Sequence, residues 1–450
     1  MKLNKTYLII ILAALATFLV VGLVIYVMAR PNQSPTDEAN GDNPIFFGES
    51  GDRAFPATPP PSDTRDQLGN NSETAPRFPN LWRVSNRPVV ASTFYSQESE
   101  SEPARYIRYL ERATGHVYEQ NLSLRTPIRL SNTTVPRIQN AFWLGDEDRL
   151  VLQYLTVNLE RTETFYGALE QKDDELIILE DSQKENAFAL AGSFLESNIT
   201  SIAGAPDSNS VFYLVKSDDG GSTGKVRTES GDLQTLYRSP HGYLQTNWPT
   251  PNTITVTSNA SALIPGFHYF VNSNTGSERI ILFEEYGLTA LTNRDASRTL
   301  YYTAENGVAL NYLHQTDELD TSLVPITTLP EKCVWSPVEL EMIYCAAPGQ
   351  LAATDMPDAW YQGRVGFSDF LWQINTETMT TEILASPRDF YQAGGGTGVD
   401  VIDMQIDPDG RYLSFINKQD LSLWALMIPQ TEPERIIQTI ADLATTTEEE

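Results

Sequence analysis

Short strand-like runs recur between residues 87 and 437, and the spacing of the turns between them limits the possible folds. The runs are rich in β-branched and aromatic residues, as in Arg149–Leu155 and Arg298–Thr303, and no segment of helical length carries a 3.6-residue apolar period. The turns fall near Gly145, Pro206, Trp248, Asn293, Trp335 and Pro408. Their intervals are about 61, 42, 45, 42 and 73 residues, and three of the five match the roughly 40–45 residue blade period of a β-propeller. The spacing therefore predicts an all-β propeller over residues 87–437.

The number of blades depends on how the beginning of this region is counted. A half-unit, Ala104–Leu110 followed by Ala113–Tyr118, precedes the first marked turn. Counting it predicts seven blades, and leaving it out predicts six. The two long intervals contain insertions, at about Gln171–Asn186 and Gly349–Gly366.

Two sequence motifs carry a resemblance to a known family. Ile406–Phe415 reads I-D-P-D-G-R-Y-L-S-F and resembles the turn of TolB-like, WD-repeat-like propellers, while Asp369–Asn375 and Leu423–Leu426 resemble a strand of the same repeats. The run Pro206–Asn209 departs from the pattern because it lacks the glycine. Taken with its N-terminal region, the chain resembles uncharacterised membrane-anchored surface proteins of small-genome bacteria. The resemblance implies a propeller with an interaction role, and it supplies no catalytic residue.

The N-terminal residues 1–30 have the character of a membrane anchor. No charged residue occurs from Thr6 to Ala29, and this apolar run is long enough to cross a bilayer as a helix. The alternative is a cleaved signal peptide, whose apolar region is about 7–15 residues long. Lys2 and Lys5 precede the run, so we expect a cytoplasmic N-terminus, a single-pass protein of the cell membrane, and an extracytoplasmic C-terminal part.

Residues 31–86 are rich in Pro, Asn, Asp, Ser and Gly, which predicts a flexible stalk. Within it, the apolar island Ile45–Phe47 either docks on the folded region or is an incidental patch. Residues 438–450 form an acidic tail. Residues 1–30 hold three basic residues and no acid, so the part beyond them carries a formal charge of −31, against −28 for the whole chain. A surface this acidic repels phosphate backbones, and we therefore expect no nucleic-acid partner.

Cys333 and Cys345 are the two cysteines of the chain, and they are placed symmetrically about Glu339. In an antiparallel hairpin this symmetry sets them opposite each other, at a distance that a disulfide spans. An exported chain meets an oxidising compartment, which favours the disulfide over two buried free thiols. Two cysteines with no neighbouring histidine make a poor zinc site.

The sequence contains little that indicates catalysis. Gly220–Gly224 matches the G-x-S-x-G pattern of hydrolases, but the segment after it reads as a strand where that motif requires a helix, so we interpret it as a hairpin turn. The four histidines, His116, His241, His268 and His314, form no local metal motif. We therefore predict no catalytic, metal-binding or cofactor-binding residue, with calcium as the one cofactor left open.

The insertion at 349–366 is the candidate partner-binding loop, through Asp358, Trp360 and Tyr361. Aromatic side chains next to an acid are common in binding surfaces. The alternative is that Trp360 and Tyr361 only fasten the loop to its own blade. The first functional hypothesis is a non-catalytic scaffold that binds an envelope protein or a wall component. The second is a glycan- or lactone-processing hydrolase with carboxylates and calcium in the central channel.

Overall fold

The computed structural model describes residues 45–46, 80–97, 103–145, 148–156, 161–172, 183–305, 308–351, 355–396 and 398–429. The predicted membrane anchor, the acidic tail and most of the predicted stalk lie outside these residues. Within them, no helix has the length and apolar character needed to cross a membrane.

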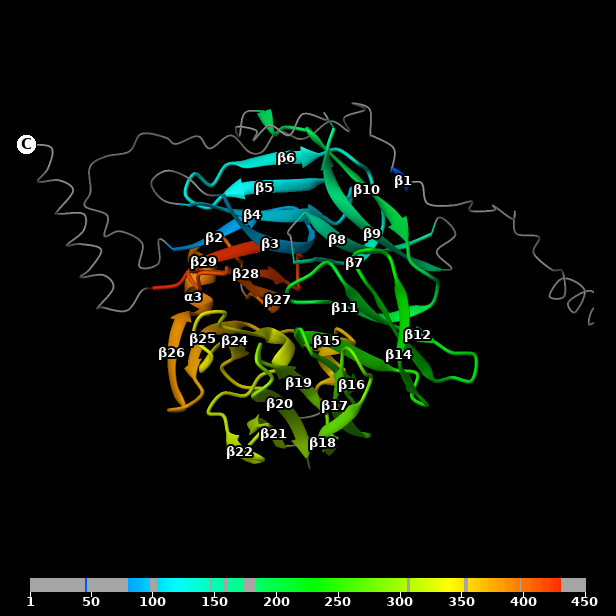
Figure 1. Ribbon diagram of the computed structural model, residues 1–450. Coiled ribbons are helices and arrows are strands. Elements are labelled where there is room, and N and C mark those ends of the chain that lie inside the picture. The colour runs from blue at the N-terminus through cyan, green and yellow to red at the C-terminus, as the bar shows by residue number, and fades with distance from the viewer. Residues whose placement is uncertain are drawn as a thin grey trace, which may run out of the picture. The chain divides into compact units, whose positions relative to one another are not determined.

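The described residues between Pro44 and the C-terminus form antiparallel sheets of consecutive strands (Figure 1). Four sheets each contain four strands in chain order: β11 (Ile199–Gly204), β12 (Val211–Lys216), β13 (Ser222–Arg227) and β14 (Leu233–Ser239); β15 (Leu244–Thr250), β16 (Thr253–Ser258), β17 (Pro265–Asn272) and β18 (Glu278–Tyr286); β19 (Thr289–Thr292), β20 (Arg298–Glu305), β21 (Val308–Gln315) and β22 (Asp320–Leu323); β23 (Cys333–Trp335), β24 (Met342–Pro348), β25 (Asp369–Asn375) and β26 (Thr380–Ala385). Short helices stand between strands: η2 (Pro330–Lys332), α2 (Asp358–Tyr361) and α3 (Pro387–Gln392).

Two further runs of four strands are joined into one larger sheet. These strands are β3 (Val89–Gln97), β4 (Ala104–Glu111), β5 (Val117–Asn121) and β6 (Pro127–Ser131), then β7 (Ile138–Trp143), β8 (Arg149–Leu155), β9 (Thr162–Gln171) and β10 (Phe188–Phe194). The joint is a single parallel pairing of Ser131 on β6 with Phe188 on β10. Each run keeps its own antiparallel ladders.

The remaining sheet combines the two ends of the folded region. β27 (Val401–Ile406), β28 (Tyr412–Asn417) and β29 (Leu423–Met427) are followed by β2 (Leu81–Ser85), which pairs antiparallel with β29. Leu81 and Trp82 of β2 are buried in the core. The folded region therefore begins before residue 87, the boundary that the sequence predicts, because a short apolar segment at the end of the predicted stalk completes the last sheet.

The sheets are arranged like the blades of a propeller. The first strands of neighbouring runs lie against each other: β3 against β7, β11 against β15, β23 against β27, and β27 against β3. In Figure 1 the fourth strands β6, β22 and β26 lie toward the outside. Apolar side chains fill the space between adjacent sheets, as where Leu371, Phe390, Phe415 and Trp424 pack together with exposed fractions of 0–1%. The fold is all-β and propeller-like, as the sequence predicts.

The turns of this fold are built by side chains that replace backbone partners. In the motif that carries the family resemblance, the Asp407 carboxylate accepts hydrogen bonds from the backbone N–H groups of Arg411 and Tyr412, at 2.5 and 2.6 Å. Gly410 adopts a φ of +69°, which glycine reaches without steric cost. The Asp-Pro-Asp-Gly sequence therefore closes the β27–β28 hairpin.

A second type of turn recurs at the ends of strands, and it is built on asparagine. The strands β5, β17 and β25 end at Asn121, Asn272 and Asn375. Each of these side-chain oxygens accepts hydrogen bonds from the backbone N–H groups two and three residues later. Such turns satisfy backbone donors where the ladder ends.

The apolar island of the predicted stalk contacts the folded region. Ile45 and Phe46 form β1, which pairs antiparallel with Gly192 and Ala191 of β10. Of the two interpretations of this island, the structure agrees with the one in which it docks on the folded region.

Candidate functional site

A cavity of about 610 Å³ lies beside the first strands of two sheets. Its walls come from β15 and β16 of one sheet, β19 of the next, the helix η2, and the helix α2 of the insertion. A cavity of this volume falls within the range of small-molecule sites. The segments that build it are distant in sequence, and they meet here because the first strands of adjacent sheets converge.

The cavity wall consists mainly of hydroxyl and amide side chains. The amides are Gln245, Asn247, Asn259 and Gln362, and the hydroxyls include Thr246, Thr255, Thr257, Ser258 and Thr289. Side chains at alternate positions of a strand face the same side, so Gln245 and Asn247 of β15 are presented together. The wall can thus both donate and accept hydrogen bonds along one ligand.

Two carboxylates stand at the end of the cavity that the insertion forms. The Tyr361 hydroxyl donates a hydrogen bond to Glu331 of η2. Asp358 accepts a hydrogen bond from the backbone N–H of Ala262 at 2.7 Å, which fixes α2 against the loop after β16. Glu331 is exposed to water on one side, but protein atoms surround its carboxyl group on most sides. This burial raises the pKa of Glu331, and the opposing effects of Lys332 and of the hydrogen bonds that Glu331 accepts are smaller.

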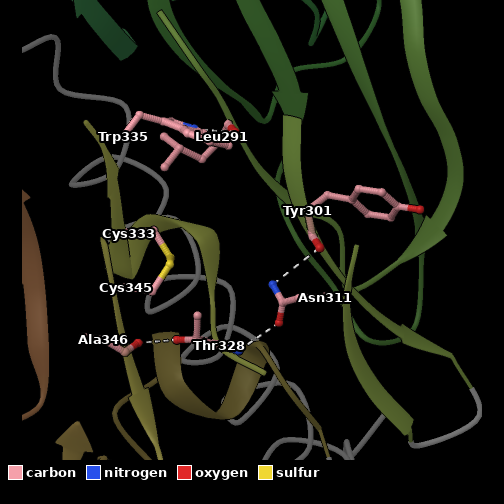
Figure 2. The surroundings of a disulfide bond; sticks show 8 residues. All are labelled: Leu291, Tyr301, Asn311, Thr328, Cys333, Trp335, Cys345 and Ala346. Atoms are coloured by element: carbon pink, nitrogen blue, oxygen red, sulfur yellow. Dashed lines mark hydrogen bonds between the residues drawn. A yellow bond between two sulfur atoms is a disulfide. The ribbon is translucent and has the colours of Figure 1, made fainter. Parts of the chain in front are cut away.

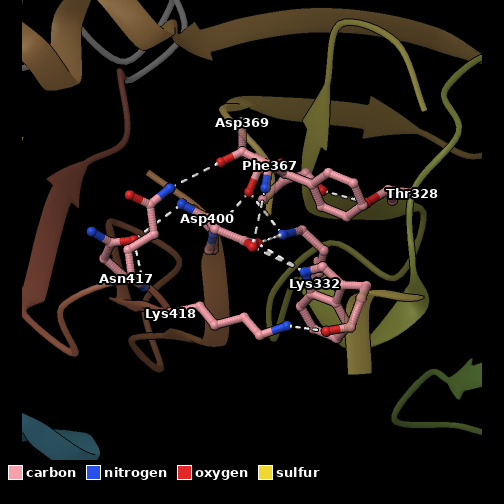
Figure 3. A network of polar contacts seen from close by, with 11 residues as sticks. Thr328, Lys332, Phe367, Asp369, Asp400, Asn417 and Lys418 are labelled. Atoms are coloured by element: carbon pink, nitrogen blue, oxygen red, sulfur yellow. Dashed lines mark hydrogen bonds and ion pairs between the residues drawn. The ribbon is translucent and has the colours of Figure 1, made fainter. Parts of the chain in front are cut away.

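Behind the cavity wall lies a buried network of charged residues (Figure 3). The Lys332 ammonium is fully buried and lies 2.6 Å from Asp400 and 2.8 Å from Asp369. Asp400 also accepts hydrogen bonds from the Trp360 indole N–H and the Phe367 backbone N–H. Burial raises the pKa of Asp369 to about 6, while Lys332 acts in the opposite direction. The network joins the insertion to β25 and to the start of β27.

Trp360 belongs to this network and not to the protein surface. Its exposed fraction is 4%, and its ring stacks on Phe367 with the planes at 9°. The Lys418 ammonium lies 3.6 Å from the centre of the ring and donates a hydrogen bond to the Trp360 carbonyl. Of the two readings of Trp360, the structure has the packing one, because the insertion folds back and buries the indole between charged side chains.

The other two residues of the candidate partner-binding loop stay accessible. Tyr361 has an exposed fraction of 49%, Asp358 is partly buried, and both line the cavity. The structure thus divides the predicted loop residues between a packing residue, Trp360, and two residues on the cavity wall.

Cys333 and Cys345 are paired across β23 and β24 and joined by a disulfide (Figure 2). Both are buried between the sheet of β19–β22 and the sheet of β23–β26. Around them, the Trp335 indole N–H donates a hydrogen bond to the Leu291 carbonyl at 3.2 Å, and the Thr328 hydroxyl donates one to the Ala346 carbonyl at 2.5 Å. The bridge therefore lies in the core and has no access to a ligand.

The glycine-rich motif lies in a hairpin, and His268 lies in the core. Gly220–Gly224 lies at the hairpin between β12 and β13, with Gly220 at a φ of +88°. His268 is fully buried and hydrogen-bonds to Thr257 and Thr292, and burial lowers its pKa to about 3. Among the described residues, no group of three or more His, Cys, Asp or Glu side chains is placed to hold a metal ion.

Sequence reasoning missed Glu331, the amides of β15 and the buried charge network. Glu331 and Lys332 are adjacent charged residues before a strand, which usually indicates a solvated turn. The one available signal was the Leu329-Pro330 pair that starts the short helix, and it says nothing about where the charges point.

No protein-family model and no curated protein matches this chain in sequence. Among solved structures, an oligogalacturonate lyase from Vibrio parahaemolyticus has 12% identity and a TM-score of 0.45, covering 77% of this chain and 99% of its own. TolB from Acinetobacter baumannii has 11% identity and a TM-score of 0.40, covering 66% and 80%. The β-propeller domain of the Trilobed protease from Pyrococcus furiosus has 12% identity and a TM-score of 0.44, covering 74% and 95%. The propeller-like fold rests on the sheet topology, and these similarities extend to no activity.

Proposed function

We propose that this protein is a membrane-anchored, extracytoplasmic propeller that binds an envelope component without catalysing a reaction. The observation that carries the proposal is the polar cavity of about 610 Å³ between the sheet of β15–β18, the sheet of β19–β22 and the insertion. Hydroxyl and amide walls with fixed strand positions suit recognition of a hydrogen-bonding ligand.

The proposal includes a seven-bladed propeller. Each run of four strands counts as one blade, including the two runs joined by the Ser131–Phe188 pairing. The last blade takes three strands from the C-terminal end of the folded region and β2 from its N-terminal end. Such closure holds the ring of sheets together and keeps the walls of the cavity in place.

The proposed address rests on the N-terminal sequence. The charge-free run from Thr6 to Ala29 supports a membrane anchor, and Lys2 and Lys5 support a cytoplasmic N-terminus. A disulfide in the core, between Cys333 and Cys345, fits an oxidising compartment. The acidic character of the chain supports partners other than nucleic acids.

The binding role is favoured over the hydrolase because of how the carboxylates are used. Asp369 and Asp400 form ion pairs with Lys332 in the buried network, and their exposed fractions are 0 and 1%. Glu331 accepts a hydrogen bond from Tyr361, and Asp358 holds the loop after β16. Each of these four carboxylates therefore already has a hydrogen-bond or ion-pair partner within the protein.

The experiment is a cross-linking pull-down from intact cells with the full-length protein as bait. We expect wild-type protein to capture a defined envelope component, and Ala260→Trp, which adds a ring at the cavity wall, to capture at least tenfold less. The matched control is Leu233→Trp, because Leu233 is exposed on β14 and does not line the cavity. Equal capture by all three proteins overturns the cavity as the binding site. Turnover of a glycan or lactone by wild-type protein, lost in Ala260→Trp, favours the hydrolase.

A further inference from the structure

The cavity wall holds two acidic side chains and no basic one among its described lining residues. Its lining includes the carboxylates Glu331 and Asp358, and among the described lining residues there is no Lys, Arg or His. Neither carboxylate forms an ion pair in the described part of the chain. A concave site of one charge sign focuses the field and attracts ligands of the opposite sign.

The nearest lysines do not remove this charge. Lys332 and Lys418 lie behind the wall, where Lys332 contacts Asp369 and Asp400, and Lys418 covers the face of Trp360. The formal charges of Lys332, Lys418, Asp369 and Asp400 sum to zero. Glu331 and Asp358 are therefore the acidic side chains on the cavity side of the wall, and no described basic side chain lines the cavity with them.

The rest of the wall has the chemistry of a site for a polyhydroxylated molecule. Gln245, Asn247 and Asn259 offer both amide donors and carbonyl acceptors, and the threonines and Ser258 offer hydroxyls. Tyr361 lies next to the carboxylates with about half of its surface exposed. A volume of about 610 Å³ suits a ligand of one or two sugar rings.

We infer that this cavity binds an amino sugar in its protonated form, with the ammonium group at Glu331 and Asp358 and the sugar hydroxyls along β15 and β16. The inference rests on the proposed function, since it names the ligand class of the same cavity. Both carboxylates keep lone pairs beyond the bonds from Tyr361 and Ala262, and an ammonium group supplies three donors for them. Sugars that carry carboxylates are excluded by the same charge.

The test is calorimetric titration of the full-length protein in detergent micelles with three disaccharides. The probes are the β-1,4 dimer of glucosamine, its N-acetylated form, and the dimer of galacturonic acid. We expect binding of the glucosamine dimer, at least tenfold weaker binding of the N-acetylated dimer, and no binding of the acidic dimer. Equal binding of the first two probes overturns the inference, because the ammonium then contributes nothing.

Charge variants test the placement of the ammonium. Glu331→Gln and Asp358→Asn preserve shape and are each expected to weaken glucosamine dimer binding at least tenfold, whereas Glu170→Gln, an exposed acid on β9 away from the cavity, leaves it unchanged. Unaltered affinity in both cavity variants overturns the placement. Should Ala260→Trp abolish capture of the envelope component while no amino sugar binds, the proposed function stands and this inference fails. Should Ala260→Trp leave that capture intact, the proposed function fails first.

Discussion

Replacing Trp360 by alanine is expected to destabilise the fold strongly. The side chain is buried with an exposed fraction of 4%, packs on Phe367, and lies in a cluster with Tyr302, Leu329 and Met356. Its indole N–H is one of the donors to the buried Asp400 carboxylate, at 3.0 and 3.1 Å from the two oxygens. Trp360→Ala therefore leaves a cavity and also removes a hydrogen-bond partner from a buried charge.

The magnitude follows from these two losses. A buried Trp→Ala substitution costs about 3–5 kcal/mol, and a buried charged acceptor that loses one donor adds about 1–3 kcal/mol. Because the two losses overlap, the free energy of unfolding should decrease by roughly 4–6 kcal/mol. With an unfolding entropy of about 2.1 cal/mol/K per residue, summed over the residues between Asn80 and Pro429, this corresponds to a decrease in Tm of roughly 5–8 °C.

The assay is differential scanning calorimetry of the full-length protein in micelles, with two comparison variants. Trp360→Phe keeps a ring but loses the donor, and it should fall between wild type and Trp360→Ala. Tyr391→Ala removes an aromatic side chain of α3 that is 65% exposed, and its Tm should change by less than about 1 °C. A wild-type Tm for Trp360→Ala would refute the burial argument and return Trp360 to the surface of the loop.

Three further predictions concern the disulfide, a buried histidine and the topology. Non-reducing peptide mapping should recover Cys333 and Cys345 in one linked peptide, and separate peptides would contradict the pairing. The double variant Cys333→Ser with Cys345→Ser should have a free energy of unfolding about 2–3 kcal/mol lower in urea denaturation, because the loop that the disulfide closes is short. Burial lowers the pKa of His268 to about 3, below the ordinary 6.5, so the unfolded chain takes up a proton between these values that the folded chain does not, and stability decreases as the pH falls. From pH 7 to pH 5, wild type should therefore lose roughly 2 kcal/mol more than His268→Gln in urea denaturation, and equal losses refute the buried neutral imidazole. Protease added to intact spheroplasts should remove the acidic region beyond residue 30, and its protection would reverse the predicted orientation.

The sequence by itself determined the features that depend on neighbouring residues. Alternating apolar runs and turn residues repeated at roughly the blade period predicted an all-β propeller, because strand and turn preferences act over a few residues. The Asp407–Gly410 turn was readable for the same reason, since its hydrogen bonds join residues within five positions of each other. The placing of Cys333 opposite Cys345 follows from the symmetry of one short hairpin.

The tertiary structure decided whatever depends on residues distant in the chain. The pairing of Leu81–Ser85 with β29 joins the two ends of the folded region, and no local pattern distinguishes that short apolar segment from the stalk before it. Trp360 reads equally well as a surface anchor or a packing residue until Asp400 and Lys418, far along the chain, are placed beside it. The cavity likewise exists only where β15, β19, η2 and α2 converge. Burial and the balance of charges are properties of that convergence, and for this reason they cannot be read from the order of the residues.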